Sequence, residues 1–250
     1  MVVEAAGTDG AVQQSGGRRV RIDVWTDLVC PWCYVGQGRL ERAIADEGVD
    51  VDLVVHSFEL DPSAPHARGD SSAPDGAVPS VGAVPSNIDY LITAKGMPRE
   101  QVVAMEERVG GLAAELDMPY AQERPMANTR TLHRVVQTVA ATVDEATAAV
   151  LFSQLQGGYF AGTFDPFDTD SLVQRAVEAG APEEAVRRAA AGESAEADDA
   201  VEADIARARS LGAQGVPFMV FDDRVAAPGA MDVATYRRAL RQLADGEEVA

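Results

Sequence analysis

The stretch Cys30-Pro31-Trp32-Cys33 decides the fold and most of the chemistry of this chain. It holds the only two cysteines among the 250 residues. Residues 20–25 before it have the pattern of a β-strand, and residues 34–47 after it have that of a helix. A cysteine at a helix start lies among unpaired backbone N–H groups and at the positive end of the helix dipole, and both stabilise a thiolate. The sequence therefore predicts a redox site that alternates between dithiol and disulfide.

The two sulfurs are expected to have different roles. Because Cys30 stands at the helix start, we expect it to be the exposed nucleophile, captured as a mixed disulfide, and Cys33, one turn deeper, to be the resolving thiol. Pro31 presets the backbone at the first helical position. Trp32 adds no charge, whereas a histidine there would add a potential positive charge. We therefore expect a disulfide that is less oxidising than that of a Cys-Pro-His-Cys site.

Two other interpretations of the cysteine pair are weaker. A zinc site needs four ligands, and the three available histidines, His56, His66 and His133, do not have ligand spacing to one another. We therefore expect no metal. Two buried thiols without chemistry are the simpler alternative, but the position of the pair at a helix start favours redox catalysis.

The charge of the chain excludes some classes of partner. The formal net charge is −19, and Lys95 is the only lysine. Such a surface repels nucleic acid and anionic membranes, so neither is expected as a partner. No segment approaches the roughly 18 uninterrupted apolar residues that span a bilayer. Residues 1–19 lack the apolar segment of a signal peptide, and we predict a disordered N-terminal tail there. A cysteine pair in a reducing compartment points to catalysis, and the expected location is cytoplasmic.

The pattern along the chain predicts an α/β domain in two segments. Residues 49–56 form a second predicted strand, so that strand, helix and strand make a right-handed parallel unit with the cysteines at the carboxyl end of the first strand. Residues 62–85 are rich in Pro, Ser, Gly and Ala and predict a loop. Helical patterns follow near 87–95, 98–116, 128–141, 144–157, 169–179, 182–191 and 194–211.

Strand pattern returns only near the end of the chain. Residues 217–221 form a predicted strand, 222–224 a turn, 225–227 a hairpin partner and 232–244 a last helix. The predicted organisation is thus an α/β domain of residues 20–61 and 212–245, interrupted by an inserted all-helical domain of residues 62–211.

Four segments resemble the DsbA family of thioredoxin-fold oxidoreductases, and more narrowly its FrnE-like branch. They are Asp27-Leu28-Val29-Cys30-Pro31-Trp32-Cys33-Tyr34, His56-Ser57-Phe58-Glu59-Leu60-Asp61-Pro62, Asn128-Thr129-Arg130-Thr131-Leu132-His133-Arg134, and Gly215-Val216-Pro217-Phe218-Met219-Val220-Phe221 with the following Pro228-Gly229-Ala230. The resemblance covers residues 20–240 and implies a thioredoxin-like fold split by an inserted all-helical domain. It also implies that Pro217 is a cis-proline facing the disulfide and that Val216 offers backbone hydrogen bonds to an extended substrate. The expected substrate-binding residues are therefore Pro31, Trp32, Val216 and Pro217.

The residues around the predicted site are assigned supporting roles. Thioredoxins carry a buried acid six residues before the first cysteine, and Val24 stands there in this chain. Asp27 is the only nearby carboxylate, and we expect a loop or cap acid rather than a proton relay. His56 ends a strand at the same sheet edge, and we expect a structural histidine bonded to a loop carbonyl. Asn128 and His133 are expected to organise a helix start and its packing.

The leading hypothesis for function is a thiol–disulfide oxidoreductase that acts on a protein or small-molecule thiol. It needs no bound cofactor, and glutathione or a thioredoxin-like protein is the candidate recycling partner. A glutathione-dependent isomerase or transferase, like 2-hydroxychromene-2-carboxylate isomerase and kappa-class glutathione transferases, is the alternative. Those proteins typically carry serine at the position of Cys30. A redox-sensing chaperone or binding module is the third hypothesis, and the sequence leaves the direction of exchange and the oligomeric state open.

Overall fold

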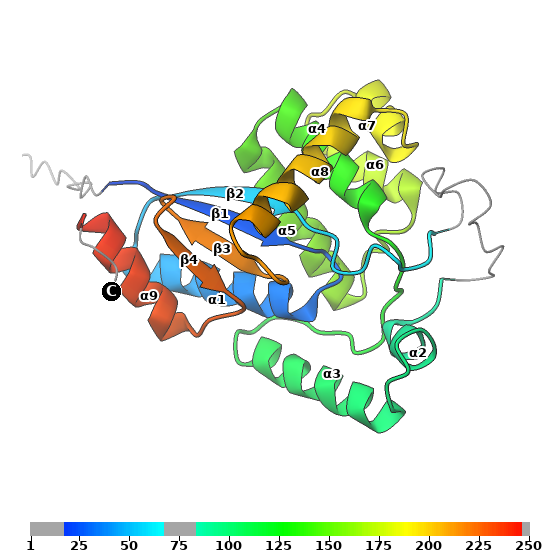
Figure 1. Ribbon diagram of the computed structural model, residues 1–250, viewed down its shortest axis with the longest axis horizontal. Coiled ribbons are helices and arrows are strands. Elements are labelled where there is room, and N and C mark those ends of the chain that lie inside the picture. Colours follow the sequence, from blue (N-terminus) through cyan, green and yellow to red (C-terminus); the bar gives the residue numbers. More distant parts are fainter. Residues whose placement is uncertain (1–17, 68–83, 247–250) are drawn as a thin grey trace, which may run out of the picture.

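A four-stranded sheet lies at the centre of the computed structural model, which describes residues 18–67 and 84–246 (Figure 1). Its strand order is β2-β1-β3-β4. β1 pairs with β2 in parallel and with β3 antiparallel, and β3 forms a hairpin with β4. The strands are β1 (Val20–Thr26), β2 (Val51–Ser57), β3 (Phe218–Phe221) and β4 (Val225–Pro228). The predicted parallel strand–helix–strand unit is confirmed, with α1 (Pro31–Glu47) as its helix.

Two helices cover one face of the sheet. α1 and α9 (Val233–Ala244) pack against each other there. Successive side chains of a strand point to opposite faces, so Val20, Ile22 and Val24 of β1 all enter the core under these helices. This core holds α1, and with it the cysteine pair, against the end of β1.

A third helix, α8 (Ala195–Ser210), covers the opposite face of the sheet. Trp25 is fully buried under it, and the indole N–H donates a 2.9 Å hydrogen bond to the carbonyl of Asp204. Because both faces are covered, the polar residue Asp23 of β1 is also enclosed and has no exposed surface. A buried carboxylate needs partners, and these are described with the site below.

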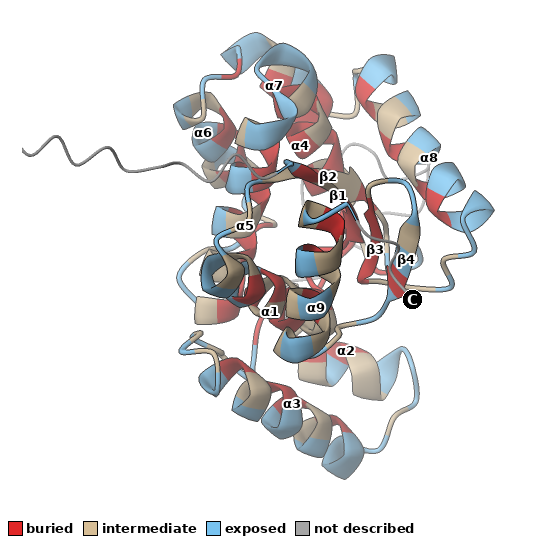
Figure 2. Ribbon diagram, turned by 90° about the vertical axis from the view of Figure 1, so that its left-hand side faces the viewer, coloured by how far each residue is buried: buried red, intermediate tan, exposed pale blue. Residues whose placement is uncertain are grey.

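A larger second core is formed by the other helices between β2 and β3. They are α2 (Asn87–Thr93), α3 (Arg99–Ala114), α4 (Arg130–Thr142), α5 (Glu145–Ala161), α6 (Thr169–Glu178) and α7 (Glu183–Ala190). Leu28, Val29, Tyr34 and Val35, on either side of the cysteines, belong to this core. Figure 2 shows buried positions concentrated in α4 and around the sheet, and exposed positions along the outer sides of α3 and α8.

The predicted strands and helices are present with small shifts of their ends. α1 begins at Pro31, three residues before the predicted start, so Cys33 lies inside its first turn. It ends at Glu47 and is capped by Gly48, whose φ of 62° is the left-handed conformation that glycine adopts at no steric cost. The predicted tail lies outside the described residues except for Arg18 and Arg19, and so do residues 68–83 of the predicted loop. None of the helices in the described ranges combines the length and apolar character that crossing a bilayer requires.

Two adjacent glycines inside α5 give a test of this packing. A Cβ added at Gly157 would meet no atom within 4 Å, whereas one added at Gly158 would lie 2.8 Å from Cβ of Phe164. Glycine costs about 1 kcal/mol relative to alanine in a helix interior. We therefore expect Gly157→Ala to raise the free energy of unfolding by about 1 kcal/mol. Gly158→Ala should lower it, because Phe164 must move. Urea titration followed by circular dichroism measures both, and equal shifts of the two midpoints in one direction would contradict the packing.

Candidate active site

Cys30 is the N-cap residue of α1. Its backbone is extended, and its sulfur accepts a hydrogen bond from the backbone N–H of Cys33 at 3.4 Å. Pro31 occupies the first helical position, where a missing N–H costs nothing, and the first turn of α1 carries no acidic side chain. Both cysteines are free thiols in this structure. The sulfur of Cys30 therefore lies where backbone N–H groups and the helix dipole favour a negative charge.

The segment that precedes β3 faces this sulfur. The Val216–Pro217 peptide bond is cis, and the thiol of Cys30 donates to the carbonyl of Val216 across 3.7 Å. Gly36 of α1 allows the close approach, because a Cβ at that position would lie 3.2 Å from both the Pro217 ring and Cβ of Ala230. Residues that are distant in the sequence thus meet at the start of α1.

The expectation that Cys30 is exposed is wrong. Cys30 and Cys33 are each only 2% exposed. The Val216 carbonyl covers the Cys30 sulfur from one side, and the neighbouring Val29 and Tyr34 are anchored in the helical core. Pro31 and Trp32, between the two cysteines, remain half-buried and are the residues of the motif that reach the surface. Access to the Cys30 sulfur therefore depends on the position of the Val216 segment.

Burial also separates the chemistry of the two thiols. It raises the pKa of the Cys33 thiol well above its usual value, and the adjacent Cys30 sulfur adds to the rise. The side chain of Thr26 and the backbone of Asp27 lower this pKa by smaller amounts. Cys33 is therefore a protonated thiol at neutral pH, suited to act after Cys30 rather than before it.

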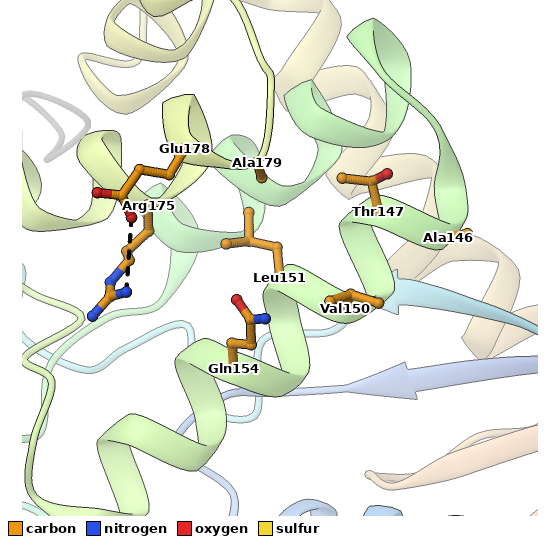
Figure 3. A pocket seen from close by; sticks show the side chains of 8 residues that line it. All are labelled: Ala146, Thr147, Val150, Leu151, Gln154, Arg175, Glu178 and Ala179. Carbon is orange, nitrogen blue, oxygen red and sulfur yellow. Dashed lines mark ion pairs between the residues drawn. The ribbon is translucent and has the colours of Figure 1, made fainter.

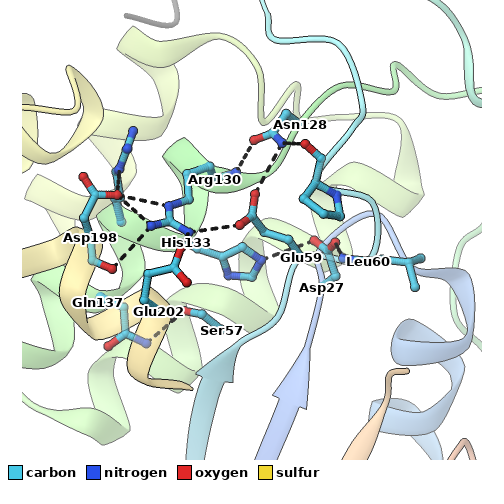
Figure 4. Close-up of polar contacts among 12 residues, drawn as sticks. Asp27, Ser57, Glu59, Leu60, Asn128, Arg130, His133, Gln137, Asp198 and Glu202 are labelled. Carbon is cyan, nitrogen blue, oxygen red and sulfur yellow. Dashed lines mark hydrogen bonds and ion pairs between the residues drawn. The ribbon is translucent and has the colours of Figure 1, made fainter. Parts of the chain in front are cut away.

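Asp27 holds the turn before the cysteines in place. It is 1% exposed, and its Oδ2 accepts a 2.7 Å hydrogen bond from the backbone N–H of Leu60 (Figure 4). Its Oδ1 faces Nε2 of His133 at 3.4 Å. The Asp27 carbonyl accepts from the side chain of Gln156 in α5 at 3.1 Å. These contacts match the predicted loop acid, and they join the turn to α4, to α5 and to the loop after β2.

A second set of contacts joins two of the sequence segments quoted above (Figure 4). Arg130 at the start of α4 pairs with Glu59 at 3.0 Å and with Asp198 of α8 at 2.9 Å. Asn128 accepts a 2.8 Å hydrogen bond from the Arg130 N–H, which confirms its predicted place at the helix start. The sequence did not reveal the partner of Glu59, because opposite charge alone does not select one arginine among many.

His56 is placed differently from the prediction. Instead of a loop carbonyl it contacts two carboxylates, with Nε2 at 2.7 Å from Asp23 and Nδ1 at 2.7 Å from Asp204. Its ring stacks on Trp25 with centroids 4.4 Å apart. The carbonyl prediction failed because α8 brings Asp204 over the strand, and because Asp23 is enclosed there as well. The polar contacts of His56 are with β1 and α8 rather than with either cysteine.

The two carboxylates determine the protonation of His56. Burial alone would lower its pKa, but the hydrogen bonds and charges of Asp204 and Asp23 raise the pKa of His56 to about 9. In return, the pKa of Asp23, which burial would raise, is lowered to about 2 by His56 and Arg21. His56 is thus a largely enclosed cation at neutral pH that ties α8 to the sheet.

The cavity between α5 and α6 does not compete with the cysteine pair as a reactive centre. This cavity of about 390 Å³ is bordered by Val150, Leu151, Gln154 and Arg175 (Figure 3). It contains neither cysteine, and Arg175 is paired with Glu178 at 3.8 Å. Within residues 18–67 and 84–246, no three His, Cys, Asp or Glu side chains gather in a way that could hold a metal ion.

Comparison with known proteins connects this geometry to one family. Residues 21–241 match the family model described as the DSBA-like thioredoxin domain. The crystal structure of a probable DsbA oxidoreductase from Streptomyces coelicolor is 33% identical, covers 92% of each chain and has a TM-score of 0.72. A 48% identical match to an uncharacterised Bacillus subtilis protein, YwbO, spans 44 residues, which is 18% of this chain and 21% of that protein.

More distant structures share the fold. A 2-hydroxychromene-2-carboxylate isomerase is 19% identical, with a TM-score of 0.60 over 91% of this chain and all of the other. The cytosolic disulfide reductase DsbM from Pseudomonas aeruginosa, solved with GSH, is 17% identical, with a TM-score of 0.51 over 90% of this chain and 98% of the other. The oxidoreductase and isomerase hypotheses therefore both have structural neighbours with this architecture.

The charged state of His56 predicts a specific pH dependence of stability. Its folded pKa of about 9 lies above the unfolded value of about 6.5, so its contribution is complete below pH 6.5 and is lost as the pH rises through 9. We expect the free energy of unfolding of the wild type to exceed that of His56→Gln by a margin that shrinks by about 3 kcal/mol between pH 6.5 and 9. Urea titrations of both proteins across this range measure the margin. A margin that does not change with pH would show that His56 is not held as a cation.

Proposed function

The chain belongs to the DSBA-like thioredoxin domain family, and on this premise we propose that it is a thiol–disulfide oxidoreductase with Cys30 and Cys33 as its redox centre. One observation carries the proposal. Cys30 caps the start of α1 and Cys33 lies in its first turn, with the Cys30 sulfur between the Cys33 N–H and the Val216 carbonyl. We assign the chain to the FrnE-like branch on the sequence segments quoted above.

The proposed reaction proceeds in two exchange steps. The Cys30 thiolate attacks one sulfur of a substrate disulfide, which forms a mixed disulfide and releases the first substrate thiolate. Cys33 then gives up its proton, and its sulfur attacks that of Cys30, which releases the second thiolate and leaves a Cys30–Cys33 disulfide. Two electrons pass from the enzyme dithiol to the substrate, and the reverse sequence oxidises a substrate dithiol.

The order of these steps follows from the two environments. The raised pKa of Cys33 keeps its proton in place while Cys30 reacts. The thiolate released in the first step is then available to accept this proton. We assign Asp27 a positioning role, since its side chain is already held by Leu60 and faces His133.

The proposed substrate surface consists of Pro31, Trp32, Val216 and Pro217. A substrate segment that lies along Val216 would meet the Cys30 sulfur from the side that the Val216 carbonyl covers. We propose that no bound cofactor takes part, and that glutathione or a thioredoxin-like protein returns the enzyme to its starting redox state. The cytoplasmic location stays a prediction from cysteine usage.

The isomerase hypothesis is supported by shared fold alone. A glutathione-dependent isomerase needs one group to activate glutathione and has no use for a second thiol at the position of Cys33. The presence of both sulfurs at the start of α1 therefore favours redox exchange, and the experiment below separates the two functions.

Single cysteine variants test the proposal by trapping. Mixed with glutathione disulfide, Cys33→Ser should accumulate a glutathione adduct on Cys30, because no resolving thiol remains. Cys30→Ser should react at least about ten-fold more slowly, because burial raises the pKa of the remaining Cys33 thiol and keeps it protonated. Mass spectrometry of the intact proteins measures both rates. A Cys33→Ser protein that forms no adduct, or that keeps full glutathione-dependent turnover of a small molecule, would refute the oxidoreductase proposal.

A further inference from the structure

Trp32, a half-buried residue of the cysteine motif, carries a cation above its ring. The guanidinium of Arg108 in α3 lies over the ring of Trp32, 5.8 Å from the ring centroid, within the range of a cation–π contact. Trp32 is half-buried and packs against the helical core, so its ring is fixed from one side. Arg108 is exposed. A positive charge, absent from the motif itself, is thus supplied to it by a neighbouring helix.

Arg108 has no anionic partner among the described residues, where no carboxylate lies within 4 Å of it. On the same helix, Arg99 forms an ion pair with Asp89 at 3.2 Å. The buried Glu106, also on α3, forms an ion pair with Arg124 at 3.0 Å and is therefore not a partner of Arg108. Arg39, on the active-site helix, donates to the carbonyls of Ala230 and Met231. Arg108 therefore keeps its full capacity for a bidentate bond to an anion.

We propose that Arg108 and Trp32 form a subsite for the carboxylate of a small thiol or disulfide substrate. The proposal rests on the oxidoreductase function proposed above and names its substrate class. The net charge of −19 repels anions from most of the surface, so an anionic substrate needs a local cation to reach the cysteines. The planar guanidinium binds the carboxylate, and the indole holds the guanidinium in place and offers an apolar surface to the carbon chain between carboxylate and sulfur.

The reaction at this subsite is the exchange already described. The carboxylate rests on Arg108 while the Cys30 thiolate attacks the substrate sulfur, and the first carboxylate-bearing thiolate leaves. Cys33 closes the enzyme disulfide and releases the second. The enzyme dithiol is oxidised by two electrons, the substrate disulfide is reduced to two thiols, and no further reactant is needed for one turnover.

Three disulfides of similar size and different charge test the subsite. They are 3,3′-dithiodipropionate, which carries two carboxylates, bis(2-hydroxyethyl) disulfide, which is neutral, and cystamine, which is cationic. Each is mixed in excess with fully reduced protein, the reaction is stopped with acid, and the enzyme disulfide is quantified by alkylation and mass spectrometry. The variants are Arg108→Met, Arg108→Glu and Arg108→Lys. Arg99→Glu is the matched control, with the same charge change on the same helix.

The subsite predicts effects that depend on substrate charge. Arg108→Met should slow the reaction with dithiodipropionate about three-fold and Arg108→Glu about ten-fold, whereas both should stay within about two-fold of the wild type with the neutral disulfide. Arg108→Glu should also accelerate the reaction with cystamine about three-fold. Arg108→Lys should retain most of the dithiodipropionate rate, and 0.5 M salt should reduce the difference between substrates.

The outcomes separate the two proposals. If the wild type reduces none of the three disulfides, the proposed oxidoreductase function is wrong, and the proposed subsite, which depends on it, is wrong as well. If the wild type reduces all three but Arg108→Glu changes the rates by one common factor, the function stands and the subsite is wrong. The same holds if Arg99→Glu reproduces the effect of Arg108→Glu. Reaction with the neutral disulfide shows in each case that the variant is folded.

Discussion

The anchoring of the cysteine turn on both sides by the helical core is the constraint on which the rest of the structure depends. Leu28 and Val29 before the turn, and Tyr34 and Val35 after it, are buried among the helices that follow β2. The ring of Tyr34 stacks on Phe160 with centroids 4.4 Å apart, and its hydroxyl donates to a carbonyl across 3.0 Å. Interiors packed in this way do not deform gradually, so the helical segment fixes the start of α1, and hence the Cys30 sulfur, relative to β3.

Charges that are wholly or largely enclosed complete this support and explain how an acidic chain arranges its few cations. His56 joins the sheet to α8, and Arg130 joins α4 and α8 to the loop after β2. Arg124 is enclosed with its partner Glu106, and its guanidinium lies against the rings of Tyr120 and Phe160. Buried pairs of this kind fix positions more than they add stability, because desolvation offsets much of their attraction. Unlike these cations, Arg108 is exposed, has no carboxylate partner among the described residues and lies over the ring of Trp32, which leaves it available to substrate beside the cysteine pair.

The sequence predicted the elements well, because strand and helix periodicities are local signals and the caps of α1 are local too. It also predicted the cysteine pair at a helix start. It could not predict the burial of Cys30, because the carbonyl that covers the sulfur comes from Val216, 186 residues later. The partners of His56 were missed for the same reason, since Asp204 lies 148 residues further along the chain. Contacts of this kind are determined by how the helices pack on the sheet. They cannot be predicted from the spacing of residues along the sequence.

The central claim is that Cys30 and Cys33 exchange electrons as one dithiol–disulfide couple. The most direct test is an equilibrium titration of the wild-type protein against mixtures of reduced and oxidised glutathione, stopped with acid, alkylated and read by intact mass. The account predicts one reversible two-electron transition, from two alkylated thiols to a protein that has lost two hydrogens and takes up no label. Two alkylated thiols at every ratio, or a stable glutathione adduct without an internal disulfide, would contradict it.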